Sequence, residues 1–289
     1  MDVKRFIMLV QEFKKQFFLE LSKSYPETEI QSFFNILIQH KLNLSRVDLA
    51  LQSSLEFNNS DLDFFQKALK ELKKQIPIQY IIGETEFYGL HFNVNSNVLI
   101  PRPETEELVD WILKDHQNSP SIKILDIGTG SGCIAISLAE NLPKAEVFAI
   151  DISSEAIKTA KSNAVINNVT VNFIEDNILT LTQLPHKFDV IVSNPPYVRE
   201  LEKEQMQLNV LANEPHLALF VENDNPLLFY DKIADLAKPC LNKNGHLYFE
   251  INQYLGAETV ELLKLKGFKK IQLKKDIFEV DRITKASLV

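Results

Sequence analysis

Residues 193 to 198 read Ser-Asn-Pro-Pro-Tyr-Val and directly follow the apolar run FDVIV. Prolines end strand pairing because proline has no N–H and a fixed φ, whereas an ordinary turn more often uses Gly, Asp or Ser. The segment therefore predicts a rigid loop with free carbonyl oxygens, flanked by the amide of Asn194 and the ring of Tyr197. Groups of this kind can accept hydrogen bonds from a ligand.

A second candidate loop, DIGTGSG, spans residues 126–132, at the end of one apolar run and the start of a helical pattern. Glycines let the chain turn sharply and let a ligand approach the backbone, and the helix that follows offers unpaired N–H groups. A tight turn that binds nothing is disfavoured, because three glycines in five residues would weaken a turn that needs one. The candidate cofactor-binding residues here are Gly128, Thr129, Gly130, Ser131 and Gly132.

Acidic and amide side chains follow the next two predicted strands. Asp151 ends a strand about twenty residues after the loop, where an acid can accept bonds from both ribose hydroxyls of a nucleoside. It could instead cap the following helix, but Ser153 or Ser154 can do that, and the ribose role is favoured. Asp176 and Asn177 follow the third strand, where either they face an adenine edge or they simply start a loop.

The spacing of the glycines narrows the cofactor class. The loop runs G-x-G-x-G, whereas the dinucleotide fingerprint is G-x-G-x-x-G, and no phosphate-binding lysine follows, which excludes a P-loop. Together with Asp151, the loop resembles that of the Rossmann-like S-adenosylmethionine methyltransferases. The resemblance implies that the glycine loop wraps the methionine part of S-adenosylmethionine, that S-adenosylhomocysteine is the product, and that no metal is used.

Asn194-Pro-Pro-Tyr197 in turn resembles the active-site motif of methyltransferases that act on planar nitrogens. The lone pair of such a nitrogen is delocalised, so the nitrogen is a poor nucleophile. The resemblance implies that Asn194 Oδ1 and the Pro195 carbonyl accept bonds from both N–H groups, while Pro195 and Pro196 fix these acceptors. Tyr197 would stack on the flat substrate, and we expect Asn194 to contact the cofactor as well.

The rest of the chain indicates which kind of planar nitrogen receives the methyl group. The segment IPIQYIIGETEFYGLHFNVNSNVLIPRPETEELVDW, then ILDIGTGSGCIAISLA, FDVIVSNPPYV, NEPHLAL and FEINQ, resembles in order and spacing the glutamine N5-methyltransferases of peptide chain release factors (the PrmC/HemK family). That family methylates the glutamine of the Gly-Gly-Gln loop in class 1 release factors. The resemblance implies that Arg102 and Glu104 shape the pocket wall, although Glu104 could serve only helix-start electrostatics.

The chain departs from the family pattern at two places. Phe220-Val221 stands where a glycine pair is usual, and KDIFEVDR lacks the usual glycine before its Asp-Arg pair. Both departures bear on loop shape. Two other functions stay open: an adenine N6-methyltransferase acting on nucleic acid, which would need a basic groove, and a non-catalytic binding module.

The elements that must position these motifs divide the chain into three parts. Residues 1–76 predict a helical domain for recognition of the substrate protein, with Ser45 as a cap and a fourth helix starting at Asp61 or Asp63. Its first apolar stripe is Phe6, Val10, Phe13, Phe17 and Leu21, and Val47, Leu51 and Leu55 mark its third helix. Residues 77–101 alternate apolar and polar side chains and predict a β-hairpin linker over 78–100.

Residues 102–289 alternate strand and helix patterns, with a helix opening at Pro103. This predicts an α/β methyltransferase domain with a mostly parallel sheet and helices on both faces. Ligands bind such sheets at the carboxyl ends of the strands, where the candidate motifs fall.

Composition excludes several classes of protein. Apolar residues make up 45% of the 289 and the formal net charge is −8, which makes nucleic acid an unfavoured partner. Cys133 and Cys240 are expected to be reduced, buried thiols, and the scattered histidines do not indicate a metal site. No apolar run reaches membrane-spanning length, and the N-terminal residues lack a signal-peptide pattern. We therefore expect a cytoplasmic enzyme.

Overall fold

The structure is a computed structural model that describes residues 8–119, 121–206 and 208–289. These residues form two compact units. Unit 1 holds the described residues up to Gly83 together with Leu208–Asn213, and unit 2 holds the described remainder. The boundary at Gly83 falls inside the stretch 77–101, and the return of residues 208–213 to unit 1 has no signal in the sequence.

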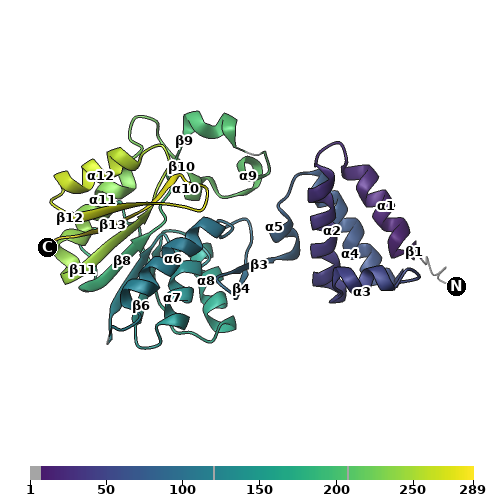
Figure 1. Ribbon diagram of the computed structural model, residues 1–289, viewed down its shortest axis with the longest axis horizontal. Coiled ribbons are helices and arrows are strands. Elements are labelled where there is room, and N and C mark those ends of the chain that lie inside the picture. The colour runs from purple at the N-terminus through teal and green to yellow at the C-terminus, as the bar shows by residue number, and fades with distance from the viewer. Residues whose placement is uncertain (1–7, 120, 207) are drawn as a thin grey trace. The chain divides into compact units, whose positions relative to one another are not determined.

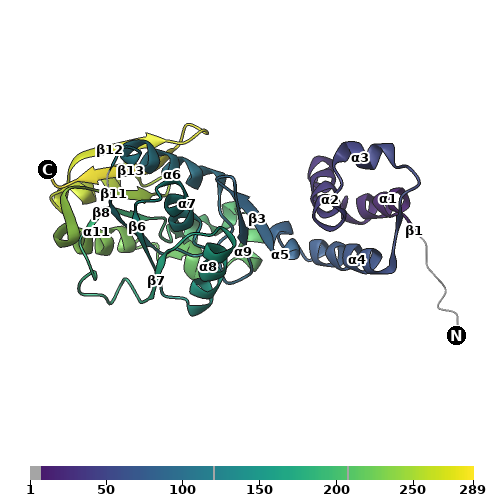
Figure 2. The same ribbon diagram turned by 90° about the horizontal axis from the view of Figure 1, so that it is seen from below.

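Unit 1 is helical. Its helices are α1 (Val10–Leu21), α2 (Glu27–Leu42), α3 (Arg46–Leu51), α4 (Asn59–Lys73), α5 (Ile78–Ile82) and α9 (Leu208–Asn213), and two short strands, β1 (Met8–Leu9) and β2 (Glu56–Phe57), pair beside them. Helix α1 packs against α2 and α4 (Figure 1, Figure 2). It buries Val10, Phe13, Phe17 and Leu21 on one face, so the predicted stripe is confirmed; Phe6 lies outside the described residues.

Details of unit 1 differ from the sequence predictions. Ser45 caps α3 as predicted, because its side chain accepts from the backbone N–H of Asp48. The predicted face of α3 is wrong, since Val47 and Leu51 are exposed and Leu49 is buried. Helix α4 begins before Asp61, because the Asn58 side chain accepts from the Asp61 N–H and caps the helix there.

The predicted hairpin over 78–100 is partly wrong. Residues 78–82 form α5, which ends at Gly83 with φ of +81° and packs Ile78 into the helical core. The hairpin itself is β3 (Glu84–Phe87) and β4 (Leu90–Asn93). Its inward rings, Phe87 and Phe92, join a core cluster of unit 2. Residues 94–100 then lead along unit 2 without regular structure.

A seven-stranded sheet with the order β12-β13-β11-β8-β5-β6-β7 forms the centre of unit 2. Its strands are β5 (Lys123–Ile127), β6 (Glu146–Asp151), β7 (Asn172–Glu175), β8 (Phe188–Ser193), β11 (Leu241–Glu250), β12 (Lys269–Lys275) and β13 (Asp281–Ser287). Strand β13 runs antiparallel to both of its neighbours, β11 and β12, and the other neighbouring strands of this sheet pair in parallel. The predicted mostly parallel α/β fold is confirmed.

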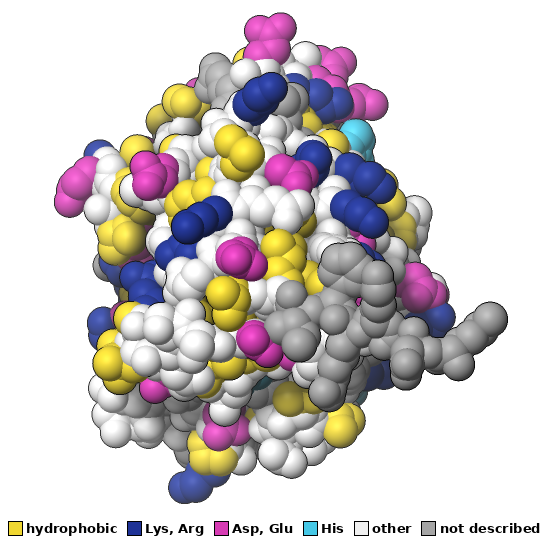
Figure 3. Space-filling view, turned by 90° about the vertical axis from the view of Figure 1, so that its right-hand side faces the viewer, with side chains coloured by type: hydrophobic (Ala, Val, Ile, Leu, Met, Phe, Trp, Pro, Cys, Tyr) yellow, Lys and Arg dark blue, Asp and Glu magenta, His cyan; other side chains and the backbone are white. Residues whose placement is uncertain are grey.

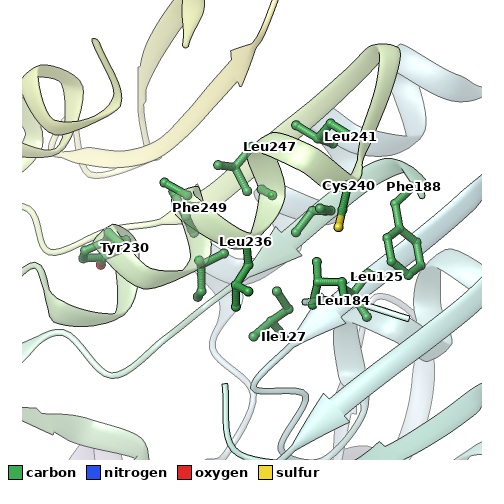
Figure 4. Close-up of a cluster of buried hydrophobic side chains, with 14 of the residues drawn as sticks. Leu125, Ile127, Leu184, Phe188, Tyr230, Leu236, Cys240, Leu241, Leu247 and Phe249 are labelled. Atoms are coloured by element: carbon green, nitrogen blue, oxygen red, sulfur yellow. The ribbon is translucent and has the colours of Figure 1, made fainter. Parts of the chain in front are cut away.

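Helices cover both faces of the sheet (Figure 1). They are α6 (Pro103–His116), α7 (Cys133–Asn141) and α8 (Ser154–Ile166) on one face and α11 (Leu228–Cys240) and α12 (Gly256–Leu265) on the other. Successive residues of β5 point to opposite faces of the sheet. Ile124 packs with residues of α6 and α7, whereas Leu125 packs with residues of α11 in the hydrophobic cluster that Figure 4 shows. Shorter elements are β9 (Val198–Arg199), a 3-10 helix (Glu200–Gln205), α10 (His216–Leu219) and β10 (Phe220–Val221).

The register of the sheet brings the candidate motifs together. Ile127 of β5 pairs with Ser193 of β8 and with Ile150 of β6. The residues that follow these three strands therefore leave the sheet side by side at its carboxyl edge. This is where the glycine loop, the NPPY loop and Asp151 begin.

Two composition-based expectations can be compared with the structure. Both thiols, Cys133 and Cys240, are free and buried, as predicted. Within the described ranges, none of the helices has the length and apolar character that crossing a membrane requires.

Candidate active site

A cavity of ≈ 380 Å³ opens at the carboxyl edge of the sheet, entirely within unit 2. Its walls come from the loop after the hairpin, from the ends of β5, β6 and β8, and from helices α10 and α11. Of the predicted site residues, those that line it are Gly128, Gly130, Asp151, Asn177, Asn194, Pro195 and Pro196. The fold thus brings the two predicted loops to one cavity.

Some residues of the glycine loop line the cavity, and others hold the loop in place. Gly128 and Gly130 have φ of +74° and +55°, and a Cβ on either would meet nothing within 4 Å. Thr129 instead donates to Asp126 over 2.6 Å, and the Ser131 carbonyl accepts from Asn163. These two and Gly132 support the loop from behind the cavity surface.

Asp151 is tied into the protein as well as lining the cavity. Its Oδ2 accepts from the Gly130 N–H over 2.8 Å, and its Oδ1 accepts from the Ser153 N–H over 2.9 Å. Ser153 caps α8, since its side chain accepts from the Ala156 N–H. A carboxylate oxygen has more than one acceptor position, so Asp151 keeps capacity for a ligand hydroxyl.

Asp176 and Asn177 lie on the cavity wall and also start a loop. Asn177 Oδ1 accepts from the Leu179 N–H, and Asp176 Oδ1 accepts from the Asn177 N–H. Apolar side chains of Ile150, Ile178 and Leu179 lie beside them on the same wall. This part of the cavity therefore suits a flat apolar ring with a polar edge.

The NPPY loop is anchored on its far side by two other elements. Asn194 Nδ2 lies 3.4 Å from Thr105 Oγ1 of α6. Tyr197 donates from its hydroxyl to Glu250 Oε1 over 3.1 Å, and its carbonyl accepts from Asn252 Nδ2 over 2.9 Å. Burial raises the pKa of the Tyr197 hydroxyl, and the neighbouring Glu250 raises it further.

Sequence reasoning missed Thr105, Glu250 and Asp126. All three are buried, and Thr105 donates to Glu250 over 2.6 Å. Burial raises the pKa of Glu250 and raises that of Asp126 to about 7. Thr105 lies inside PRPETE and Glu250 inside FEINQ, so both belong to motifs that the sequence shows, but no local pattern indicates that these two distant side chains form a hydrogen bond.

Arg102 and Glu104 were predicted to shape the pocket wall. Arg102 donates to Glu214 Oε1 over 2.6 Å, and that carboxylate is buried. This pair holds the start of α6 to the NEPHLAL segment, next to Pro215 of the cavity wall. Glu104 lies in the first turn of α6, close enough to Glu250 to raise the pKa of that carboxyl.

Comparison with known proteins decides the family. Residues 105–223 match the model of the methyltransferase small domain, and residues 14–83 match that of the PrmC N-terminal domain. The chain is 56% identical to a release factor glutamine methyltransferase of Flavobacterium psychrophilum over 97% of its own length and 99% of the relative's. The chain belongs to the release factor glutamine methyltransferase family. A second family member, from Bacteroides thetaiotaomicron, is 41% identical over 92% of this chain and 96% of its own.

Solved structures agree on the fold of this family member. The catalytic domain of hMettl16, solved in complex with the MAT2A 3'UTR hairpin 6, has a TM-score of 0.57 at 15% identity, covering 82% of this chain and 85% of that one. The human methyltransferase 10 domain containing protein has a TM-score of 0.52 at 19% identity, covering 70% and 91%. At these identities the likeness concerns the methyltransferase fold alone.

The two departures from the release factor glutamine methyltransferase pattern have structural roles. Phe220–Val221 forms β10, which pairs with β9 directly after the NPPY loop. In KDIFEVDR, Asp276 accepts from the Phe278 N–H and from Arg282 Nε, and Glu279 has φ of +61°. Within the described residues, no group of three or more His, Cys, Asp or Glu side chains is arranged to hold a metal ion.

Proposed function

We propose that the chain transfers the methyl group of S-adenosylmethionine to the side-chain amide nitrogen, N5, of the glutamine in the Gly-Gly-Gln loop of class 1 peptide chain release factors. One observation carries the proposal: Asn194 and Pro195 line the same cavity as Gly128, Gly130 and Asp151. Amide-recognising acceptors and a cofactor loop thus share one space. Membership of the family points to the substrate.

The cavity fits S-adenosylmethionine in size and chemistry. Its volume of ≈ 380 Å³ is within the usual range of about 300–1,000 Å³ for small-molecule sites. Gly128 and Gly130 present bare backbone, Asp151 offers acceptor capacity for ribose hydroxyls, and Ile150 and Ile178 provide apolar surface for a base. When bound, the cofactor supplies a methyl carbon that is electrophilic because it is attached to a sulfonium.

The residues of the NPPY loop make the amide nitrogen reactive. Asn194 Oδ1 and the Pro195 carbonyl accept bonds from the two N–H groups and draw the nitrogen lone pair out of conjugation. As the N–C bond forms, the electron pair of the breaking C–S bond would stay on sulfur as a neutral thioether, and one N–H proton would be released to water. Pro195 and Pro196 keep the acceptors from moving, and positioning of this kind is worth about 7–11 kcal/mol of barrier. Tyr197 would pack on the flat amide.

The two parts of the chain have different roles in this proposal. Residues 1–76 recognise the substrate protein, residues 77–101 link, and residues 102–289 carry out transfer in the cytoplasm. On the face that Figure 3 shows, Lys and Arg side chains are interspersed with Asp and Glu. A nucleic-acid groove relies on clustered basic groups, so the mixed charge of this one face agrees better with a protein substrate.

The test is transfer of labelled methyl from the cofactor to purified macromolecules. We expect label on a release factor that has its Gly-Gly-Gln glutamine and none on the same factor with Gln→Ala. Asn194→Ala should reduce turnover by about 10²–10³-fold while cofactor binding survives. Asn118→Ala makes the same change at an exposed position and should leave turnover intact. Label on DNA alone would refute the substrate, and turnover of Asn194→Ala within about tenfold of wild type would refute the role of Asn194.

A further inference from the structure

We propose that Glu250 is a positioning residue that sets the direction of the Asn194 amide through the hydroxyl of Thr105. This inference rests on the proposed function, because it concerns the same acceptors. Three elements meet here: Thr105 lies in the first turn of α6, Asn194 follows β8, and Glu250 ends β11. Strands β8 and β11 are neighbours, with Phe249 paired to Ser193.

The hydrogen-bond directions follow from what each group can donate. A threonine hydroxyl has one hydrogen, and Thr105 gives it to Glu250 Oε2 over 2.6 Å. What remains on Thr105 Oγ1 is acceptor capacity, which faces Asn194 Nδ2 at 3.4 Å. The Asn194 NH₂ group is therefore held toward Thr105, and Oδ1 is the group left for the cavity. An amide turned the other way would present donors to a substrate amide that also offers donors.

The second carboxylate oxygen supports the other end of the same loop. Glu250 Oε1 accepts from the Tyr197 hydroxyl over 3.1 Å. Glu250 is 1% exposed and Thr105 is 2% exposed, so water does not compete for these bonds. Burial raises the pKa of Glu250, while the bonds from Thr105 and Tyr197 and the positive charge of Arg282 favour its ionised form.

A purely structural role does not account for a carboxylate at this place. A charge in the interior carries a desolvation cost, and glutamine would fill the same volume without it. Glutamine, however, accepts at one end only and donates at the other. Only the carboxylate accepts at both oxygens, which is what the two hydroxyls of Thr105 and Tyr197 need if both are to donate. Glu250 thus fixes which group donates and which accepts in the hydrogen bonds that join Tyr197, Thr105 and Asn194.

The primary test is Glu250→Gln, measured by steady-state methylation of the release factor and by calorimetric titration with the cofactor. An NH₂ group that faces Thr105 would donate to its hydroxyl and free the Thr105 hydrogen to turn toward Asn194. An NH₂ group that faces Tyr197 would oppose the donor that anchors the other end of the same loop. We expect kcat to fall by about 10²-fold, with KM for the release factor and Kd for the cofactor within about threefold of wild type. A kcat within about threefold of wild type overturns the proposal.

Variants at Thr105 test the same path while Glu250 stays intact. Thr105→Val keeps the shape and removes the hydroxyl, and it should reproduce the loss in kcat. Thr105→Ser keeps the hydroxyl and should recover most of it. The double variant Glu250→Gln with Thr105→Val should be no slower than the worse single variant, because residues acting through one path are non-additive. Multiplicative losses, or a failure of Thr105→Ser to recover activity, overturn the proposal.

A spectroscopic measurement separates this inference from the identity of the substrate. In ¹⁵N-labelled protein, the side-chain NH₂ resonance of Asn194 is the one that disappears in Asn194→Ala. It should move in both Glu250→Gln and Thr105→Val, and stay in place in the exposed control Asn118→Ala. An unmoved resonance overturns the inference. If the wild type methylates no release factor, the proposed function fails, yet this resonance still reports whether Glu250 controls Asn194.

Discussion

The backbone N–H of Gly130 donates to Asp151 Oδ2 across 2.8 Å, which joins the glycine loop to the end of strand β6. The other oxygen of the same carboxylate accepts from the Ser153 N–H. Asp151 therefore shapes the loop on one side and the start of α8 on the other. Its contribution to ligand binding and its contribution to the fold are coupled.

Replacing Asp151 with Asn should weaken both the binding of the cofactor and the stability of the fold. An amide has one acceptor oxygen, so its NH₂ group must oppose either the Gly130 N–H or the Ser153 N–H. We expect a loss of about 1–3 kcal/mol in the free energy of unfolding and at least about tenfold weaker binding of S-adenosylmethionine. Urea unfolding and calorimetric titration measure the two. Asp224→Asn, at an exposed position, serves as the control; unchanged cofactor affinity in Asp151→Asn would contradict the assignment.

Two glycines of one loop should respond differently to the same substitution. A Cβ on Gly132 would lie 2.8 Å from Ile136 Cδ1 and 3.1 Å from Ala160 Cβ, whereas a Cβ on Gly130 meets nothing within 4 Å. Both have positive φ, which costs an alanine about 1–2 kcal/mol. Gly132→Ala should therefore lower the unfolding temperature more, while Gly130→Ala should weaken cofactor binding more, because its methyl group enters the cavity. If the same variant showed the larger loss both in unfolding temperature and in cofactor binding, this would contradict the assignment of Gly130 to the cavity lining and of Gly132 to the support of the loop.

Asn163 should be required for cofactor binding although it lies behind the cavity. Its Oδ1 accepts from the Asn93 N–H, and its Nδ2 donates to the carbonyls of Asn93 and Ser131. It thus joins strand β4, which leads into the cavity wall at residues 96–99, to the glycine loop.

Asn163→Leu keeps the approximate size and removes these bonds. We expect a loss of about 1–3 kcal/mol in the free energy of unfolding, since a partly buried N–H and two carbonyls lose their partner, and weaker cofactor binding. Chemical denaturation and titration check the two effects, with Asn118→Leu as an exposed control that should change the free energy of unfolding by no more than about 0.5 kcal/mol. If Asn163→Leu bound the cofactor as tightly as wild type, the cavity wall at residues 96–99 would hold its position without this residue.

Asp126 should make stability depend on pH. The pKa of Asp126 is raised from an ordinary value of 3.8 to about 7, chiefly by burial and to a smaller extent by the nearby Asp151, although the hydrogen bond from Thr129 acts in the opposite direction. Because the folded state holds the proton more tightly than the unfolded state, the stability that this group contributes is complete below pH 3.8 and is lost as pH rises toward 7.

Asp126→Asn mimics the protonated group at every pH. The free energy of unfolding of the variant, relative to wild type, should therefore rise between about pH 4 and pH 7 and level off above that. Urea unfolding across this range measures the difference, and subtraction cancels the contributions of other titrating groups. A difference that is flat with pH would mean that Asp126 titrates normally.

Much of the fold and site could be predicted from local sequence. The stripe Val10, Phe13, Phe17 and Leu21 indicates a helix because its spacing follows the helical repeat, and the glycines at 128, 130 and 132 indicate a loop that needs positive φ. The stretch IQYII was misassigned because its alternation suits a strand, yet Gly83 ends it as a helix. For α3, the buried residue is Leu49 rather than Val47 or Leu51, which depends on the neighbours of the helix.

By itself the sequence determined the order of strands and helices, the two loops and the types of group they carry, because turns, caps and apolar periodicity act over a few residues. Only the tertiary structure decided which distant groups meet. Thr105, Asn194 and Glu250 are joined by hydrogen bonds although as many as 145 positions separate them. Hydrogen bonds act over about 3 Å, so such partners exist only after the sheet has set the register of β8 and β11 and packed α6 against them.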